Sequence, residues 1–440
     1  MMQRNLIDET HKLVSQKVKI SGWVNARRNH GKIIFIDLRD RSGIVQLVIL
    51  PNNTKAYEVD KEARAEYVIS LEGLVKERPD KNIKRNDLGK IEIEVENMEI
   101  LSSVEGELPF EVSQKGLEIN IQTLFDNRNL SLRNRKINDI FKVYAQVLKS
   151  YADVMRENGF LEIKTPKILS SATEGGANFF KIKYFKRDAF LAQSPQFYKQ
   201  AGVGAFERVF EIGTVFRAEP HFTTRHVNEY TGLDAEMGFI ENFSEIMIQL
   251  QKTMKRIIED VKKNCKPELE EYNSGELAVP DKFPQIKLTE ALDILKKEYG
   301  KVIEGIDIDP EGERLISDWA KKVHQSDFIF LTHYPASTRP FYTMPSRDSQ
   351  YTESFDLIFR GVEIATGGQR IHNYHQLVKN IKLHRLNPED FKTYLDMFKI
   401  GMPPHGGWGL GSERITQKIL NLSNIKEAIL FPRDVNRLTP

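Results

Sequence analysis

Five residues between positions 217 and 234 carry side chains that together suit a nucleotide. Arg217 and Glu219 end one predicted strand, and His226, Tyr230 and Asp234 lie at even spacings on the next. Because side chains alternate along a strand, the first two share a face and so do the other three, and one surface could thus offer a cation, a ring and carboxylates. An arginine suits a phosphate, an aromatic ring stacks on a purine, and a carboxylate accepts from an amine. An exposed hairpin crossed by salt bridges is the alternative.

A second pair of acids lies in a predicted hairpin whose turn is Arg360-Gly361. Asp356 and Glu363 could face each other across this hairpin. Two neighbouring carboxylates repel each other unless a cation lies between them, and Mg²⁺ bound by carboxylates and substrate phosphates is the usual cation. Surface acids bridged by lysines are the competing interpretation.

A third feature is the glycine-rich segment Gly406–Gly411, followed by Ser412-Glu413-Arg414 and a helical pattern over Ile415–Leu422. Glycines let a backbone approach a ligand closely, and an arginine at the start of a helix adds charge to an anion-binding helix terminus. Many turns share such a glycine pattern, so this feature is weak alone.

The hydrophobic pattern predicts the elements that must position these residues. Near the N-terminus, five short runs rich in β-branched and aromatic residues predict a small barrel of the OB type. These runs are Val18–Val24, Ile33–Leu38, Ile44–Leu50, Glu66–Leu74 and Ile91–Leu101.

Farther along the chain, strands and helices mix without a regular βαβ repeat. Apolar residues at three- and four-residue steps predict helices ending at Asn158-Gly159 and spanning Asn242–Asn264. Between these helices we predict strands over Arg208–Arg217 and His226–Phe239 with a polar loop over Ala218–Arg225. The sequence therefore favours an α+β fold with an antiparallel sheet flanked by helices.

Composition excludes several classes of protein. The chain has 440 residues, 40% of them hydrophobic and 29% charged, which indicates a globular protein of about two or three domains. No apolar run reaches the ~20 residues of a membrane span, and the N-terminus lacks the apolar region of a secretory signal. One cysteine, Cys265, allows neither an internal disulfide nor a multi-thiolate zinc site. We therefore expect a cytoplasmic protein without membrane association.

The formal net charge is only +2. Any contact with nucleic acid must therefore come from a local arrangement of basic groups rather than from the field of the whole molecule.

Together these motifs resemble those of the class II aminoacyl-tRNA synthetases. The order FRAE (216–219), RH (225–226) with a following aromatic residue, and GLGSER (409–414) resembles motifs 2 and 3, and GFLEIKTP (159–166) resembles motif 1. The N-terminal barrel is similar to the anticodon-binding OB domain of the aspartyl, asparaginyl and lysyl subgroup. Within that subgroup, QSPQFYKQ (193–200) resembles the aspartyl members of the compact archaeal or eukaryotic form.

The resemblance implies three parts: an OB-fold anticodon-binding domain over residues 1–105, a hinge over 106–132 and a class II catalytic domain over 133–440. It also implies the ligation of L-aspartate to tRNA-Asp through an aspartyl-adenylate, and it leaves tRNA-Asn open as a second substrate. By the same resemblance we expect ATP as a substrate, Mg²⁺ as the cofactor and a homodimer formed through motif 1. No covalent protein nucleophile is needed, because positioning and charge neutralisation drive such transfers.

The resemblance assigns the site residues position by position. Arg217 and Arg414 match the catalytic arginines on the α- and γ-phosphates, and Tyr230 matches the ring that stacks on adenine. The implied ATP-binding residues are Arg217, Ala218, Glu219, Arg225, His226, Val227, Tyr230, Glu363, Gly411, Ser412, Glu413 and Arg414.

Aspartate and the metal ion receive their own sets of residues. The implied magnesium ligands are Asp356, Glu363 and Thr366, the last standing where several relatives have serine. The implied aspartate-binding residues are Glu174, Ser194, Gln196, Lys199, Arg217, Asp234, Thr366 and Arg370.

Lys199 and Arg370 match the two cations that face the substrate's side-chain carboxylate. A desolvated cation pair without an anion is costly for a neutral amide ligand, which favours aspartate over asparagine. An exposed lysine on a helix is the plainer interpretation of Lys199.

In the barrel, Arg27, Arg28, Phe35 and Gln46 match anticodon-contacting positions, with a ring for stacking and side chains for base edges. Taken alone, Phe35 is more typical of a half-buried core residue. Pro220 departs from the family pattern, because archaeal relatives usually have an acid there. Asn25 lies where some archaeal enzymes carry residues that separate tRNA-Asp from tRNA-Asn, so the resemblance assigns no such discrimination to this chain. An asparaginyl-tRNA synthetase and a non-catalytic RNA-binding paralogue are the alternatives.

Overall fold

A computed structural model describes residues 2–79, 87–114, 119–170, 178–220 and 223–440. The chain divides into two compact units, Met1–Glu118 and Ile119–Pro440, each with its own apolar core. They are described separately below.

The first unit is a closed barrel of five strands in the order β1-β2-β3-β5-β4. Alternate side chains such as Ile34, Ile36 and Leu38 of β2 point inward and are buried, which is the pattern of a half-buried strand. The predicted barrel is therefore confirmed. Its elements are β1 (Lys17–His30), β2 (Ile33–Arg39), β3 (Ile44–Ile49), α1 (Thr54–Glu62), β4 (Val68–Glu77) and β5 (Ile91–Ser102).

The second unit is built on an eight-stranded sheet with the order β12-β13-β14-β15-β16-β11-β10-β6. Its central pairings are antiparallel, as predicted, and only the edge pairs β12–β13 and β10–β6 are parallel. The strands are β6 (Leu161–Glu162), β10 (Arg208–Phe216), β11 (Glu229–Gly238), β12 (Gln285–Lys287), β13 (Phe328–Thr332), β14 (Ser354–Phe359), β15 (Val362–Arg370) and β16 (His405–Gly411).

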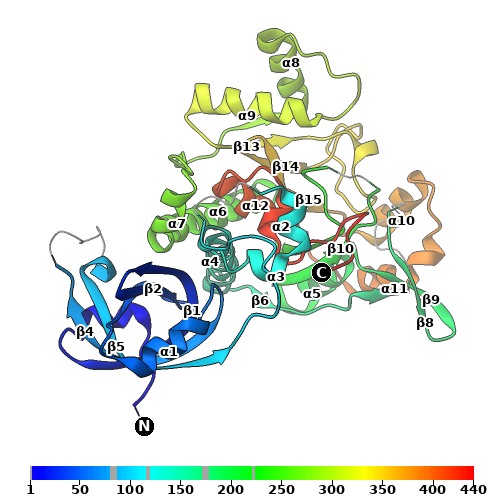
Figure 1. The fold of residues 1–440 in the computed structure, drawn as a ribbon. Coiled ribbons are helices and arrows are strands. Elements are labelled where there is room, and N and C mark those ends of the chain that lie inside the picture. Colours follow the sequence, from blue (N-terminus) through cyan, green and yellow to red (C-terminus); the bar gives the residue numbers. More distant parts are fainter. Residues whose placement is uncertain (1, 80–86, 115–118, 171–177, 221–222) are drawn as a thin grey trace. The chain divides into compact units, whose positions relative to one another are not determined.

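Helices and a small sheet surround these strands (Figure 1). The small sheet has the order β7-β9-β8, with β7 (Ile168–Leu169), β8 (Lys181–Tyr184) and β9 (Arg187–Leu191). The helices are α2 (Ile121–Asp126), α3 (Arg128–Ser131), α4 (Arg135–Glu157), α5 (Gln196–Phe206), α6 (Ser244–Asn264), α7 (Lys266–Glu271), α8 (Leu288–Tyr299), α9 (Pro310–His324), α10 (Tyr374–Leu383), α11 (Lys392–Asp396) and α12 (Ser412–Ile419).

The main core lies between one face of the large sheet and α4, α6 and α12. Leu233 and Ala235 of β11 and Trp408 of β16 point into this core and are fully buried. The residues between them, Asp234 and Gly407 for example, therefore point to the opposite face. That opposite face carries the candidate site, and the predicted helices α4 and α6 support the sheet from behind.

The motif 2 strands differ from the prediction at their facing ends. β10 ends at Phe216 and β11 begins at Glu229, so Arg217 and His226 lie in the connecting loop rather than on strands. The next pair keeps only one cross-strand hydrogen bond: the amide of Arg217 donates to the carbonyl of Asn228 at 2.9 Å, but the amide of Asn228 donates to the carbonyl of Arg433 in the C-terminal segment, also at 2.9 Å. His226 therefore does not share a strand face with Tyr230 and Asp234.

The β14–β15 hairpin turns at Arg360-Gly361 as predicted, and both residues have positive φ, 46° and 77°. Its register differs from the expected one: Asp356 is opposite Thr366, and Glu363 is opposite Ile358, with a β-bulge between the two pairs. The bulge inserts one extra residue, so Glu363 and Thr366 share a face although they are three positions apart. The direct pairing of Asp356 with Glu363 is therefore wrong.

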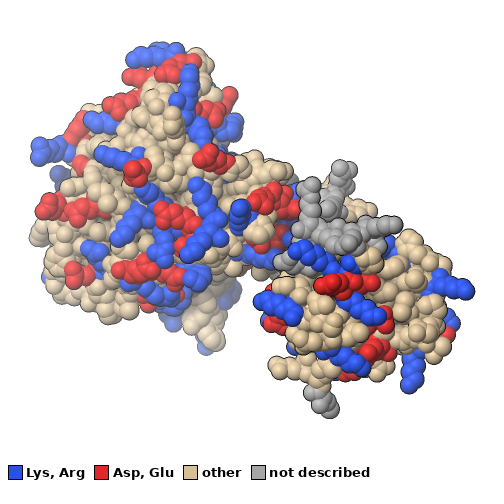
Figure 2. All heavy atoms as spheres, turned by 90° about the vertical axis from the view of Figure 1, so that its left-hand side faces the viewer, with Lys and Arg blue, Asp and Glu red and all other residues tan. Residues whose placement is uncertain are grey.

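Charged residues of both signs are interspersed over the face shown in Figure 2, in keeping with the small net charge. Across the described residues, none of the helices combines the length and the apolar character needed to cross a membrane.

Candidate active site

A cavity of about 330 Å³ opens on the face of the large sheet that lies opposite α4 and α6. β10, β11, β15, β16 and the start of α5 and α12 supply most of its lining. The predicted residues that it brings together are Ser194, Gln196, Lys199, Arg217, Glu219, Arg225, His226, Val227, Tyr230, Asp234, Glu363, Thr366, Arg370, Gly411, Glu413 and Arg414.

The glycines of β16 make room for this cavity. Gly407 and Gly409 alternate with the buried Trp408, so they face the site. A Cβ atom at Gly407 would lie 2.4 Å from Oε2 of Glu236, and one at Gly409 would lie 3.4 Å from Oδ1 of Asp234. The glycine-rich segment is therefore a strand that leaves room for two carboxylates, and its residues Gly409 and Gly411 line the cavity.

One end of the cavity gathers the nucleotide-type groups. The guanidinium carbon of Arg217 lies 5.9 Å from the centre of the Tyr230 ring, and NH1 lies 3.7 Å from Oε1 of Glu219. Nε2 of His226 lies 3.6 Å from Oε2 of the same glutamate. An aromatic face, two cationic or titratable groups and a carboxylate are thus adjacent, although His226 reaches them from the loop.

Asn228, which the sequence analysis missed, holds this end together. Its side-chain amide donates to the carbonyl oxygens of Arg217 at 2.6 Å and of Glu219 at 3.2 Å. Asn228 is buried, so these bonds are shielded from water. Its spacing in the sequence carries no signal of this role, since the loop conformation decides which carbonyls it meets.

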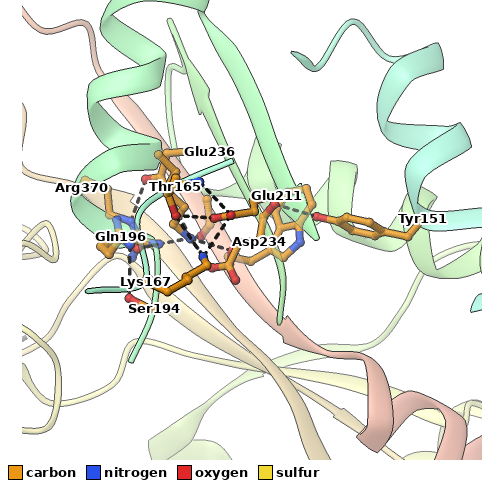
Figure 3. A network of polar contacts seen from close by, with 12 residues as sticks. Tyr151, Thr165, Lys167, Ser194, Gln196, Glu211, Asp234, Glu236 and Arg370 are labelled. Carbon is orange, nitrogen blue, oxygen red and sulfur yellow. Dashed lines mark hydrogen bonds and ion pairs between the residues drawn. The ribbon is translucent and has the colours of Figure 1, made fainter. Parts of the chain in front are cut away.

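The opposite end is a buried cluster of four charges. Nζ of Lys199 lies 3.1 Å from Oδ1 of Asp234 and 3.4 Å from Oε2 of Glu236, and donates to the carbonyl of Trp408 at 2.8 Å. Nε of Arg370 donates to Oε1 of Glu236 at 2.9 Å. Figure 3 shows Arg370, Glu236 and Asp234 within this network.

Glu236 supplies an anion next to Lys199 and Arg370 that the sequence did not reveal. The two cations do not form a pair without an anion, because Asp234 and Glu236 balance them before any ligand binds. Burial raises the pKa of Asp234. Burial also acts to raise the pKa of Glu236, but Arg370 and Lys199 outweigh it and hold that pKa below its ordinary value. Charge count alone therefore does not separate aspartate from asparagine.

Ser194 and Gln196 border this cluster at the start of α5. The amide of Gln196 donates to Oγ of Ser194 at 3.2 Å, and NH2 of Arg370 lies 3.5 Å from Oε1 of Gln196. Behind them, Lys167 contacts Glu211 at 3.0 Å, and Glu211 is the cross-strand neighbour of Asp234. Lys167 and Glu211 were missed because their partners come from separate segments (Figure 3).

The three predicted metal ligands lie together on β14 and β15. Oγ1 of Thr366 donates to Oε1 of Glu363 at 2.9 Å, whereas Oδ2 of Asp356 accepts from NH2 of Arg339 at 2.8 Å. Arg339, a residue missed from the sequence, also stacks on the ring of Tyr334 at 3.7 Å. Arg339 is thus a protein counter-ion for Asp356, at a position for which the sequence suggested magnesium or bridging lysines.

The two carboxylates differ in protonation behaviour. Burial raises the pKa of Asp356, against the opposing charge of Arg339. Burial also acts on Glu363, but Arg414 and the Thr366 hydroxyl outweigh it and lower the pKa of Glu363. Oδ1 of Asp356 is buried and receives no hydrogen bond of ordinary geometry from the described residues. No cluster of three or more His, Cys, Asp or Glu residues suited to a metal occurs in the described part of the chain.

Of the residues predicted for the ATP, aspartate and metal sites, three that the structure describes do not line the cavity. Ala218 donates its amide to the carbonyl of Asn178 at 3.1 Å, and Ser412 is buried, with Oγ donating to the carbonyl of Thr231 at 2.9 Å. Asp356 lies behind the lining, on Arg339. Glu174 falls outside the described residues.

Glu413 and Arg225 line the cavity but are held by the protein. Oε1 of Glu413 accepts from the amide of Thr231 at 2.9 Å and from Tyr144 at 3.1 Å. Arg225 is paired with Glu313 of α9. Arg414, the second predicted catalytic arginine, donates to the carbonyl of Glu363 at 2.8 Å.

In the barrel, three of the four candidate anticodon residues share a surface. NH2 of Arg28 lies 3.4 Å from Oε1 of Gln46, and Arg28 is the cross-strand neighbour of Phe35 on β2. Phe35 is half-buried on the outer face, with its ring 5.7 Å from that of His30. Arg27 points elsewhere and pairs with the buried Asp60 of α1, because consecutive residues of a strand face opposite sides.

Comparison with known proteins agrees with this geometry. Residues 120–435 match the model of the class II tRNA synthetases (D, K and N), and residues 18–101 match that of the OB-fold nucleic acid binding domain. The chain belongs to the class II tRNA synthetases of the D, K and N group.

Its similar relatives within that group are aspartate–tRNA ligases. It is 42% identical to the aspartate–tRNA(Asp/Asn) ligase of Aeropyrum pernix, over 99% of this chain and 98% of that protein. It is 43% identical to the aspartate–tRNA(Asp) ligase of Pyrococcus abyssi, over 98% of both chains.

Solved structures include both specificities. The asparaginyl-tRNA synthetase of Pyrococcus horikoshii, complexed with asparaginyl-adenylate, superimposes with a TM-score of 0.92 at 30% identity, covering 100% of both chains. The aspartyl-tRNA synthetase of Entamoeba histolytica superimposes with a TM-score of 0.89 at 30% identity, covering 100% of this chain and 93% of that one. The two solved structures are equally identical to this chain, whereas the relatives matched at 42% and 43% identity are named aspartate ligases, which favours aspartate over the asparaginyl alternative.

Proposed function

We propose that this chain attaches L-aspartate to tRNA-Asp in two steps that consume ATP. The aspartate α-carboxylate attacks the α-phosphorus of ATP and pyrophosphate leaves, giving aspartyl-adenylate. A ribose hydroxyl of the terminal tRNA adenosine then takes the aspartyl group, and AMP leaves. The single observation that carries the proposal is one cavity with nucleotide-type groups around Arg217 and Tyr230 and a buried charge cluster around Lys199 and Arg370.

At the nucleotide end, positioning and charge do the chemistry that this reaction needs. Tyr230 stacks on adenine, Arg217 neutralises the α-phosphate and Arg414 takes the γ-phosphate. The hydrogen bonds from Asn228 to the carbonyls of Arg217 and Glu219 support these assignments, because they hold both residues in place without occupying the cavity.

At the amino-acid end, the substrate brings a cation and an anion of its own. Its ammonium group binds Asp234, together with Glu174, and this releases part of the charge of Lys199. Lys199 and Arg370 then face the side-chain carboxylate, with Ser194 and Gln196 at the border. An amide in the same place leaves this redistributed positive charge unbalanced, which is costly in a buried site.

Magnesium fits the residues on β14 and β15. Glu363 and Thr366 offer oxygen atoms to the cavity, and Asp356 lies behind them on the neighbouring strand. Among the described residues, the buried Oδ1 of Asp356 accepts no hydrogen bond of ordinary geometry, so it is an acceptor that a cation can satisfy. When bound with ATP, the ion neutralises phosphate charge. Arg339 holds the other oxygen of Asp356 and so keeps this carboxylate in place.

We propose that the barrel recognises RNA, with Phe35, Arg28 and Gln46 contacting the bases of a splayed anticodon.

We also propose tRNA-Asn as a second substrate, because the relative from Aeropyrum pernix is named for both tRNAs. Aminoacylation of purified tRNA-Asp and tRNA-Asn side by side tests this extension, and charging of tRNA-Asp alone contradicts it.

We also propose a homodimer in the cytoplasm. β6 is an edge strand of the large sheet, and β7, the next strand along the chain, is an edge strand of the small sheet. Leu161 of β6 lies in the motif 1 segment with 47% of its surface exposed, and Ile168 of β7 lies just after it with 49% exposed. An exposed apolar edge favours pairing with another chain. Light scattering after size-exclusion chromatography should give twice the mass of one chain, and a Leu161→Asp variant should give less dimer. A monomer at all concentrations contradicts the dimer.

The test of the main function is ATP–pyrophosphate exchange with each amino acid in turn. We expect exchange with aspartate and little with asparagine. Exchange with asparagine and none with aspartate would establish the asparaginyl alternative. Binding of tRNA without adenylate formation from any amino acid would establish a non-catalytic paralogue.

A further inference from the structure

Glu313 of α9 lies outside the three synthetase motifs but contacts two residues of the site. Its Oε2 is paired with NH2 of Arg225, in the loop before β11, and accepts from the backbone amide of Glu363 at 3.2 Å, on β15. Glu313 is buried, with 8% of its surface exposed. A buried carboxylate is costly unless it is paired and hydrogen-bonded, so these two contacts account for its presence.

These contacts extend to the second phosphate-binding arginine. The backbone amide of Glu363 is held by Glu313, and its carbonyl accepts from NH1 of Arg414 at 2.8 Å. One continuous series of contacts therefore connects Arg225, Glu313, Glu363 and Arg414. This series links the loop between β10 and β11 to the start of α12, and it crosses β15, the strand that carries a proposed metal ligand.

Arg225 is held in a way that leaves one nitrogen for a ligand. NH2 is occupied by Glu313, whereas NH1 is buried and has no hydrogen-bond partner among the described residues. Arg225 also lines the cavity. A buried guanidinium nitrogen that donates to nothing is costly in free energy, and a phosphate oxygen is an acceptor that removes this cost.

α9 is a firm support for this arrangement. Ile316 and Ala320 pack with Ile329 of β13 in a separate apolar cluster, and Oγ of Ser317 accepts from the amide of Gly361 at 2.9 Å. The carboxylate of Glu313 is thus attached to a helix that is fixed both to the sheet and to the β14–β15 turn.

We propose that Glu313 is a positioning residue for ATP: it orients Arg225 toward the phosphates and sets the spacing between Arg225 and Arg414. This inference rests on the proposed function and adds to it a residue that acts through Arg225. It does not contact the substrate itself. Misplacement of a phosphate-binding group by about 1 Å can cost about 100-fold in rate, so the effect should be large.

The test is the kinetics of ATP–pyrophosphate exchange by the full-length chain carrying Glu313→Gln. We expect kcat/KM for ATP to fall about 10-fold or more, because charge-assisted hydrogen bonds are roughly twice as strong as neutral ones. KM for aspartate should stay within about 2-fold of the wild-type value. Asp318→Asn is the matched control, since it makes the same chemical change at an exposed position of the same helix, and it should change neither constant.

A merely structural role predicts a different pattern. If Glu313→Gln lowers the affinity for ATP and for aspartate equally, or changes neither, the inference is wrong. The double variant Arg225→Ala/Glu313→Gln keeps the test informative if a single variant folds poorly. A residue that acts through Arg225 should have little further effect in the Arg225→Ala background, whereas independent effects would multiply.

The wild-type chain separates this inference from the proposed function. If the wild-type chain shows no exchange with any amino acid, the proposed function fails. If the wild-type chain is active with aspartate and Glu313→Gln is as active as Asp318→Asn, only the inference about Glu313 fails.

Discussion

Nε of Arg370 donates a 2.9 Å hydrogen bond to Oε1 of Glu236, and both side chains are buried. The cation that the family resemblance assigns to the substrate carboxylate therefore already has a protein carboxylate as its partner. The amino-acid end of the cavity is an ion cluster with equal numbers of positive and negative charges. A ligand must therefore redistribute the charges of this cluster, because the cluster carries no excess positive charge to neutralise.

The first prediction concerns the stability of this cluster. Arg370→Met leaves Glu236 buried without its main cation, and we expect the free energy of unfolding to fall by about 3–5 kcal/mol, as when one partner of a buried pair is removed. Urea denaturation measures this. The double variant Arg370→Met/Glu236→Gln should recover much of the loss, and Lys149→Ala, which breaks an exposed pair with Asp153, should cost less than about 1 kcal/mol. A larger loss in the double variant would contradict the pairing.

The second prediction concerns Asn228. Asn228→Ala removes the hydrogen bonds to the carbonyls of Arg217 and Glu219, so the nucleotide end should lose its geometry while the buried charge cluster stays intact. We expect kcat/KM for ATP to fall about 10-fold with little change in KM for aspartate, measured by ATP–pyrophosphate exchange. Asn264→Ala, at the exposed end of α6, is the control. An equal rise of both KM values would count against this role.

The third prediction is that adenylate formation depends on the second unit and anticodon binding on the barrel. Arg414→Ala should abolish adenylate formation and leave the affinity for tRNA nearly unchanged. Phe35→Ala should weaken tRNA binding by about 1–3 kcal/mol, the range for one stacked base, and leave ATP–pyrophosphate exchange intact. Filter binding and exchange assays measure the two quantities. If either variant lost both activities equally, this division of labour would be refuted.

The fourth prediction is a pH dependence of stability. Nδ1 of His405 lies 2.8 Å from the carbonyl of Pro403, Nε2 lies 2.8 Å from Nε2 of Gln200, and burial lowers the pKa of His405 to about 4. The unfolded chain, with a histidine pKa of about 6.5, binds the proton first as the pH falls. Stability is therefore complete above pH ~6.5 and falls by up to about 3 kcal/mol as the pH approaches 4.

Denaturation curves at several pH values check this fourth prediction. His405→Gln should lose the part of the pH dependence of the free energy of unfolding that His405 causes, although its stability at neutral pH will be lower. His375→Gln, at an exposed position of α10, should keep the wild-type slope. A slope that is unchanged in His405→Gln would show that other groups cause the acid sensitivity.

Much of the fold follows from the linear pattern of residues. Strand alternation predicted the five barrel strands, and three- and four-residue periodicity predicted α4 and α6, because each reports which side of an element is buried. The spacing around Arg360-Gly361 predicted a hairpin. Its bulge was not predictable, since the extra residue is set by how β14 and β15 pack on their neighbours.

The motifs around Arg217, Lys199 and Arg414 were also recognisable in the sequence, and most of their residues line one cavity. The counter-ions of these residues were not. Glu236, Glu313 and Arg339 meet Arg370, Arg225 and Asp356 only because distant segments fold onto one another. A charged side chain carries no local signal of its partner, because ion pairing depends on distance and burial in three dimensions. The sequence alone thus determined the kinds of group present in the site, and the tertiary structure decided which charges remain for a ligand.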